Sequence, residues 1–419
     1  MAAAVGGLPA AADLRHVCPS LLTVVVTTSP IVSHPSTLML DTLLASFRLG
    51  ASALARCSKI IVCDGYNQPD EASGGGGGGA EKKKKRNPRY RRRKNISERE
   101  AANYEAFVRK LRRENGGNDD NDNDARKDKD EDDEDDEEQR IGSRAARIRR
   151  RAAPHTKILS FGKGERLGFA LALKEALALV ETEFVMVVQH DWAFLRPFPL
   201  ERVLRVMQTH PEVKYVGLPS TSSLTYAETA SVRDPGLRSH MTSQEARFGL
   251  PLYPLLFWFD KTHVARTKHY RMFVFGQYPA VLPSEAKHGR VCCSGGGNLN
   301  GSIIINNNAD GVQMQRARFK RGDFIEDTLG HRELADIRAH GFLAHAKYGT
   351  FLYDDGSGEV IAHLDGRRFL TPAQRERQGI PRHVLQSGTA YVRVKLKAKA
   401  MEEEQEQEEA EEEEERKEV

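Results

Sequence analysis

The sequence has few cysteines, and none of them are arranged as a recognisable site. There are 5 among 419 residues, an odd number, and no two form a Cys-x-x-Cys pair. Disulfide-stapled secreted domains usually have an even number of cysteines, and cysteine zinc sites usually have pairs with Cys-x-x-Cys spacing. Cys57 and Cys63 also lie in apolar segments that we expect to be buried. The cysteine pattern therefore excludes both kinds of site and indicates a reducing compartment.

Long hydrophobic runs are missing as well. No apolar stretch reaches the length of about 20 residues that a membrane-spanning helix needs. The start of the chain, Met1 to Ala12, is rich in alanine and glycine and lacks the basic and apolar regions of a secretory signal. We expect a cytoplasmic protein without a transmembrane segment. Organellar targeting stays an open alternative.

The two common glycine-rich nucleotide motifs are also missing. The turn from Gly162 to Gly168 lacks the Gly-Lys-Ser/Thr ending of a P-loop and the Gly-x-Gly-x-x-Gly spacing of a dinucleotide fingerprint. Lys163 and Arg166 in this turn can still meet a phosphate. The alternative is a flexible connection between a strand and a helix.

Two parts of the chain have too little apolar sequence to form a core. Residues 72–151 combine the glycine run Gly74–Gly79 with the basic block Lys82–Arg86 and the acidic block Asp128–Glu138, and the tail from Met401 is dominated by glutamate. Such segments bury too little apolar surface to offset the entropy lost on ordering. We expect 72–151 to be a disordered insert. Within it, residues 96–113 have some helical character and are expected to form a short solvated helix.

The remaining residues predict one domain with two extensions. Residues 1–20 are an N-terminal extension expected to be disordered, and residues 371–419 are a C-terminal extension with an acidic or coiled-coil tail. Residues 21–71 and 152–370 then form a single domain of roughly 300 residues. The basic and acidic blocks of the insert can neutralise each other, so we do not expect nucleic-acid binding. Electrostatic partners of the insert stay an alternative.

Strands and helices alternate along this domain. The β-branched runs Leu21 to Thr28 and Lys59 to Asp64 predict parallel strands around a helix that begins near Pro35. The same kind of pattern predicts further strands at 156–161, 184–188, 213–217, 254–259, 342–353 and 359–364, and helices at 169–180, 200–208, 263–270 and 331–340. The order predicts an α/β fold with a mostly parallel central sheet.

Acidic residues follow several of these strands. The buried run Phe184 to Val188 ends in Gln189, His190 and Asp191, and the second strand ends in Asp64. In open α/β sheets, ligands bind at the carboxyl ends of the strands. Asp191 is therefore either a ligand-binding carboxylate or the cap of a following helix, and the strand alone does not decide between them.

Further along the chain, Glu326-Asp327 precede a helix, and His345 and His363 lie in the C-terminal strands. Carboxylates and imidazoles together suit Mn²⁺ or Mg²⁺ holding a diphosphate. A histidine in an apolar strand is, however, more often a core residue.

The order of these segments resembles the nucleotide-sugar-dependent glycosyltransferases of the GT-A type, and the family 2 group in particular. TVVVTTSPIVSHPSTLMLDTLLASF is similar to that family's first strand and helix, and IIVCDG to its second strand. GERLGFALALKEALALVETEFVMVVQHDW is similar to the segment that ends in the Asp-x-Asp metal motif. DFIEDTLGHRE resembles the region of the catalytic base. The resemblance covers Thr23 to about Arg367 without the insert and implies a GT-A-like αβα sandwich.

The resemblance also implies roles for individual residues. Asp191 would be the second aspartate of the metal motif, with Gln189 in place of the first, and His363 or His345 would be a further metal ligand. Asp327, with Glu326 beside it, would take the proton of the acceptor hydroxyl. The donor-binding residues that we predict are Thr28, Asp64, Arg166 and Gln189.

The reaction implied is transfer of a sugar from a nucleoside-diphosphate sugar to a hydroxyl of a carbohydrate, lipid or protein, with inversion and a divalent cation. Two alternatives stay open. The missing aspartate at Gln189 is compatible with a catalytically inactive binding or scaffold protein. A sugar-phosphate nucleotidyltransferase has the same sheet type, but it needs a glycine-rich phosphate loop that Thr27 to Ser33 does not provide.

Overall fold

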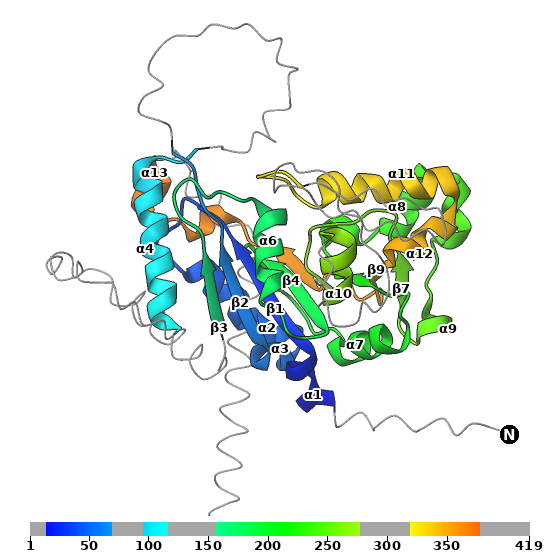
Figure 1. Ribbon diagram of the computed structural model, residues 1–419. Coiled ribbons are helices and arrows are strands. Elements are labelled where there is room, and N and C mark those ends of the chain that lie inside the picture. The colour runs from blue at the N-terminus through cyan, green and yellow to red at the C-terminus, as the bar shows by residue number, and fades with distance from the viewer. Residues whose placement is uncertain (1–13, 69–94, 116–155, 277–318, 378–419) are drawn as a thin grey trace, which may run out of the picture.

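The computed structural model describes residues 14–68, 95–115, 156–276 and 319–377 (Figure 1). The basic and acidic blocks, the glutamate-rich tail and a Gly/Asn-rich segment at 292–308 lie outside these residues. No helix among the described residues is long and apolar enough to cross a membrane.

The fold is built on a large central sheet with the strand order β3-β2-β1-β4-β8-β6-β9-β7. Its strands are β1 (Leu22–Thr28), β2 (Ser58–Cys63), β3 (Thr156–Ser160), β4 (Phe184–Gln189), β6 (Tyr215–Gly217), β7 (Leu252–Pro254), β8 (His263–Arg266) and β9 (Thr350–Tyr353). Strands β3, β2, β1 and β4 are parallel, β6 and β9 are parallel to each other, and β8 is antiparallel to both β4 and β6. The predicted α/β class with a mostly parallel sheet is confirmed.

The helices cover the two faces of this sheet (Figure 1). Side chains alternate between the faces of a strand, so Val24 and Val26 of β1 join the core beneath α2 (Leu38–Gly50), and Val25 joins the core beneath α6 (Phe169–Ala178). The other α-helices are α1 (Leu14–Leu21), α3 (Ser52–Arg56), α4 (Glu98–Glu114), α7 (Leu200–Thr209), α8 (Tyr226–Arg233), α9 (Glu245–Phe248), α10 (Thr267–His269), α11 (His331–His340), α12 (His345–Tyr348) and α13 (Pro372–Arg377).

Helix α4 corrects the prediction of a solvated helix inside the insert. Tyr104, Phe107 and Leu111 are buried in the same core as α2 and β1. The ring of Phe107 stacks on His34 with centroids 4.1 Å apart, and the Tyr104 hydroxyl donates to the carbonyl of Asp64 at 2.8 Å. The charged residues around this helix concealed an apolar face that packs against the domain.

Replacing Tyr104 with phenylalanine should therefore lower the free energy of unfolding by about 1–3 kcal/mol, because the buried Asp64 carbonyl loses its donor. A solvated helix would show no change. Arg113→Ala on the exposed side of α4 is the control, with an expected effect within about 0.5 kcal/mol. Urea unfolding followed by circular dichroism measures both. Equal midpoints for Tyr104→Phe and wild type would contradict the packing described.

Five other sequence predictions of local structure are wrong. Residues 14–20 belong to helix α1, with Cys18 buried in the core, and are not part of a disordered extension. Helix α2 begins at Leu38, not near Pro35. Only Leu252–Pro254 forms a strand near the predicted 254–259, because a short apolar run also suits a buried loop. Residues His263–Arg266 form strand β8 and not a helix, since Val264 and Ala265 face opposite cores. The segment from Phe342 is helical until β9 begins at Thr350.

Candidate functional site

The carboxyl ends of three parallel strands meet at one edge of the sheet. Thr28 at the end of β1 pairs with Cys63 of β2, and Thr27 pairs with Gln189 of β4. The backbone hydrogen bonds to β1 continue for one residue beyond the ends of β2 and β4. Asp64 N–H donates to the Thr28 carbonyl and His190 N–H donates to the Thr27 carbonyl, both at 2.9 Å. The register thus places the residues after β2 and β4 side by side.

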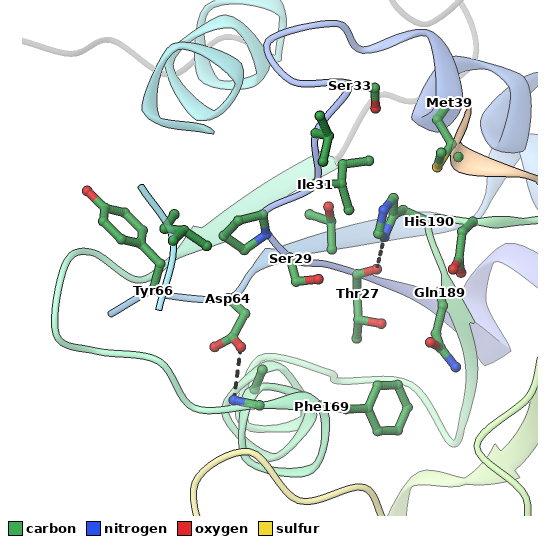
Figure 2. Close-up of a pocket in the computed structure, with 18 of the residues that line it drawn as sticks. Thr27, Ser29, Ile31, Ser33, Met39, Asp64, Tyr66, Phe169, Gln189 and His190 are labelled. Carbon is green, nitrogen blue, oxygen red and sulfur yellow. Dashed lines mark hydrogen bonds between the residues drawn. The ribbon is translucent and has the colours of Figure 1, made fainter. Parts of the chain in front are cut away.

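A pocket of about 650 Å³ opens at this edge. Figure 2 shows Asp64 and Tyr66 on one side of it, Gln189 and His190 on the opposite side, and Phe169 between them. Six predicted site residues line the pocket, namely Thr28, Asp64, Arg166, Gln189, Asp191 and His363. The Thr28 hydroxyl is buried and has no hydrogen-bond partner among the described residues.

Asp64 fixes the start of helix α6. Its two carboxylate oxygens accept hydrogen bonds from the backbone N–H groups of Leu167 at 2.8 Å and Gly168 at 2.9 Å. Burial raises the pKa of Asp64 above its ordinary value, and these hydrogen bonds offset only part of that effect. The backbone N–H of Gly65 also bonds this carboxylate. Because a carboxylate offers about four acceptor positions, about one remains for a ligand in the pocket.

The turn before α6 approaches the chain near Gly322 closely. Gly168 has a φ of 81°, and a Cβ there would lie 2.4 Å from the Cα of Gly322. Leu167 and Gly322 are joined by a backbone hydrogen bond of 2.8 Å. This close contact requires glycine and leaves Arg166 and the positive end of α6 at the pocket wall.

Asp191 and His363 form a pair at the other wall. The small antiparallel sheet of β5 (Trp192–Phe194) and β10 (Ile361–His363) pairs His363 with Trp192. The Nε2 atom of His363 lies 3.0 Å from Asp191 Oδ2, and the two side chains are 57% and 29% exposed. The hydrogen bond to Asp191 raises the pKa of His363. Burial alone would raise the pKa of Asp191, but its interactions with His363 and His190 lower it.

This pair is suited to a divalent cation bound together with a ligand. The Oδ1 atom of Asp191 is buried without a partner in the described part of the chain, so one carboxylate oxygen remains to coordinate an ion. No group of three or more His, Cys, Asp or Glu side chains within the described residues is placed to hold a metal alone. Mg²⁺ is commonly held by one or two protein ligands plus substrate phosphates, so the residues present fit such an ion.

Gln189 connects the end of β4 to a carboxyl pair, the buried Asp260 and the half-buried Glu326. Its side-chain amide donates to the carbonyl of Asp260 at 2.9 Å. Asp260 N–H donates to Glu326 Oε2 at 3.3 Å, and Glu326 N–H donates to Asp260 Oδ2 at 3.2 Å. Glu326 begins a π-helical turn, Glu326–Gly330, in which Asp327 is exposed. Neither Glu326 nor Asp327 lines the pocket itself.

His345 is not brought to this site. Its side chain is buried and its Nε2 lies 2.7 Å from the carbonyl of Thr350 at the amino end of β9. Strand β9 runs in the same direction as β4, so Thr350 belongs to the edge of the sheet opposite Asp191. Of the two histidines predicted as metal ligands, only His363 lies beside Asp191.

No family model matches this sequence, and no curated protein matches it. Among solved structures, the chain is similar to glucosyl-3-phosphoglycerate synthase from Mycobacterium tuberculosis in complex with Mn²⁺, uridine diphosphate and glucosyl-3-phosphoglycerate. The identity is 11%, the TM-score is 0.28, and 63% of each chain is covered. The chain is also similar to S. aureus TarS, with 11% identity and a TM-score of 0.29 over 60% of this chain and 29% of that one.

A third similar structure is the WbbM bifunctional glycosyltransferase without ligands, with 8% identity and a TM-score of 0.24 over 61% of this chain and 33% of that one. The chain thus spans less than two thirds of the length of each of these proteins. The last of these is named as a glycosyltransferase, the type that the sequence resembles. TM-scores this low carry no argument about activity or ligands.

Sequence reasoning missed the part of the pocket that the insert provides. Ile96 and Glu100 line the pocket, and Ile96 N–H donates to the Asn67 carbonyl at 2.9 Å. The sequence does contain a pattern that predicts a packed helix here. Ser97 and Glu100 form a capping box at the start of α4, and apolar residues follow at helical spacing.

The sequence predicted no role for Asp260. In the structure it is a buried carboxyl group, with 3% of its surface exposed. Burial, and next the charge of Glu326, raise the pKa of Asp260 well above its ordinary value. Asp327, Tyr215 and Tyr270 also face it. A raised folded-state pKa means that the folded protein holds a proton that the unfolded chain releases.

The stability that this proton provides is complete below the ordinary pKa and is lost as the pH rises through the folded-state pKa. Asp260→Asn removes this dependence, so the melting temperature of the variant relative to wild type should rise as the pH increases above the ordinary carboxyl pKa. Asp336→Asn is the control, because the pKa of Asp336 is lowered and its difference should stay flat in this range above that pKa. A flat difference for Asp260→Asn would show that Asp260 is ionised in the folded protein.

Proposed function

We propose that this protein is a glycosyltransferase that moves a sugar from a nucleoside-diphosphate sugar to an acceptor hydroxyl in a single inverting displacement. The observation that carries the proposal is the pocket at the carboxyl edge, which has acceptors on one wall, Arg166 and the start of α6 on another, and the Asp191–His363 pair on a third. Its volume of about 650 Å³ suits a ligand with a base, two phosphates and a sugar.

The nucleoside, the diphosphate and the sugar of the donor would contact different parts of the pocket. The remaining acceptor position of Asp64 and the aromatic ring of Tyr66 support binding of a nucleoside at the β2 side. Arg166 and the positive end of α6 support binding of the diphosphate, since both favour negative charge. The sugar would then lie toward Gln189 and the segment that carries Asp327.

Asp191 and His363 would hold a divalent cation, Mn²⁺ or Mg²⁺, on the diphosphate. When bound, such an ion neutralises the charge that develops on the departing nucleoside diphosphate. His363 has to release its proton to coordinate the ion, so ion binding should be favoured by higher pH. Asp191, with one oxygen unpartnered, supplies the negative charge.

Asp327 would accept the proton of the attacking hydroxyl. It is exposed, whereas Glu326 beside it is held by the backbone of Asp260. Glu326 therefore serves to anchor the turn from which Asp327 projects. The acceptor is a carbohydrate, a lipid or a protein with a free hydroxyl.

Screening nucleotide sugars for slow hydrolysis tests the activity, because a transferase without its acceptor commonly passes the sugar to water. Release of nucleoside diphosphate from at least one donor is expected with Mn²⁺, and its loss is expected on adding a chelator or with Asp191→Ala. Diphosphate binding without turnover of any donor, even with acceptor pools added, would favour the inactive binding protein instead.

A further inference from the structure

Gln189 stands where the resemblance implies the first aspartate of a metal motif, yet the structure uses a property that aspartate lacks. The Gln189 amide is a donor, and it is bonded to the Asp260 carbonyl at 2.9 Å. An aspartate side chain, ionised at neutral pH, is only an acceptor. The residue therefore makes a contact that the expected aspartate could not make.

The segment that Gln189 holds has no sheet ladder of its own. Residues 255–260 follow β7 without forming a strand. They are tied to the sheet at three points. Leu255 and Thr350 exchange two hydrogen bonds, from Leu255 N–H to the Thr350 carbonyl at 2.9 Å and from the Thr350 hydroxyl to the Leu255 carbonyl at 3.1 Å. The Tyr215 hydroxyl donates to the Phe259 carbonyl at 2.9 Å, and the Gln189 amide donates to the Asp260 carbonyl. Gln189 is the contact at the end nearest the pocket.

This segment in turn holds the turn that carries Asp327. Asp260 and Glu326 exchange two hydrogen bonds through their backbone N–H groups and carboxylates. A second contact lies at Gly330, where a Cβ would come 2.5 Å from the ring of Phe257 and 2.7 Å from the carbonyl of Trp258. The end of β4, the 255–260 segment and the 326–330 turn are thus joined in sequence.

We infer that Gln189 is a positioning residue that fixes the 326–330 turn, and with it Asp327, relative to the donor pocket. This inference rests on the proposed function for its catalytic consequence. Gln189 is then not a weakened metal ligand but the connection between the part of the site that binds the donor and the part that takes the proton.

Two substitutions separate these possibilities. Gln189→Met keeps the length of the side chain and removes the donor, and Gln189→Asp installs the aspartate of the motif. If Gln189 positions the 326–330 turn, both variants lose the hydrogen bond to the Asp260 carbonyl and behave alike. If Gln189 is a weakened metal position, Gln189→Asp gains activity and Gln189→Met is close to wild type. Gln208→Met is the matched control, because among the described residues that exposed amide contacts only Glu183, at 3.4 Å.

Hydrogen exchange and steady-state kinetics measure the outcome. Both Gln189 variants should exchange the amides of 257–260 and 326–330 faster than wild type, and kcat should fall by about 10- to 100-fold, since small displacements of reacting groups have effects of this size. The affinity for Mn²⁺ and uridine diphosphate should stay within about threefold, a difference below 1 kcal/mol. Unchanged exchange, or tighter metal binding and faster turnover in Gln189→Asp, would overturn the inference.

The exchange measurement does not depend on activity. If the wild-type protein binds no nucleotide, the proposed function is wrong. Faster exchange in both Gln189 variants, with wild-type exchange in Gln208→Met, would still establish that Gln189 holds the 326–330 turn. Melting temperatures of all the variants check that they are folded, and exchange at residues remote from the segment provides an internal reference.

Discussion

Asp191→Ala is expected to lower the metal-dependent affinity for a nucleoside diphosphate by at least about 100-fold, because the loss of a charged ligand from a metal–phosphate site is worth several kcal/mol. Asp191 is the carboxylate of the pair, and its Oδ1 has no other described partner. Binding in the presence of a chelator should change little. Calorimetric titration of wild type and variant with uridine diphosphate, with and without Mn²⁺, measures the difference.

Asp336→Ala is the matched control for this experiment. Asp336 is also ion-paired, to Lys347 at 2.6 Å, and its side chain is 25% exposed against 29% for Asp191. It lies on α11, away from the residues that line the pocket. Binding by Asp336→Ala should equal that of wild type. Equal binding by Asp191→Ala would show that Asp191 holds no metal.

Asp327→Asn is expected to lower kcat by about 10²–10⁴-fold, the usual contribution of a general base. Affinity for the donor should be retained, because Asp327 does not line the donor pocket. Asparagine keeps the size of the side chain but cannot accept the proton. Initial rates at saturating donor, together with diphosphate binding, separate loss of chemistry from loss of binding.

Glu326→Gln and Glu183→Gln make this test specific. Glu326 should show a smaller loss than Asp327, since its carboxylate holds the turn through Asp260 and a glutamine oxygen can still accept that hydrogen bond. Glu183 precedes β4 at the opposite edge of the sheet, and its loss should not affect turnover. A larger loss in Glu326→Gln than in Asp327→Asn would reassign the base to Glu326.

The centre of the fold could be read from the sequence because its strands are long and locally encoded. Strands β1, β2 and β4 are β-branched runs buried on both faces, and each was predicted within one or two residues. Strand β8, with 4 residues, is stabilised mainly by its neighbours β4 and β6. Pairing between distant segments leaves no local pattern, so short strands of this kind were misassigned.

The candidate site was predictable to the same extent. Asp64 and Asp191 follow strands that were predicted to be parallel, so their position at the same edge of the sheet followed from the shared strand direction. The choice between His345 and His363 could not be predicted, because it depends on the pairing of β5 with β10 across more than a hundred intervening residues. The wall formed by α4 was hidden by composition, since charged residues outnumber the apolar ones that pack.

We propose above all that the pocket between β1, β2 and β4 binds a nucleoside diphosphate through a divalent cation. The most direct test is calorimetric titration of the wild-type protein with a panel of nucleoside diphosphates in Mn²⁺ and in chelator. We expect at least one diphosphate to bind, with an affinity that falls at least about tenfold when the cation is removed. Absence of binding for every diphosphate at all Mn²⁺ concentrations would contradict it.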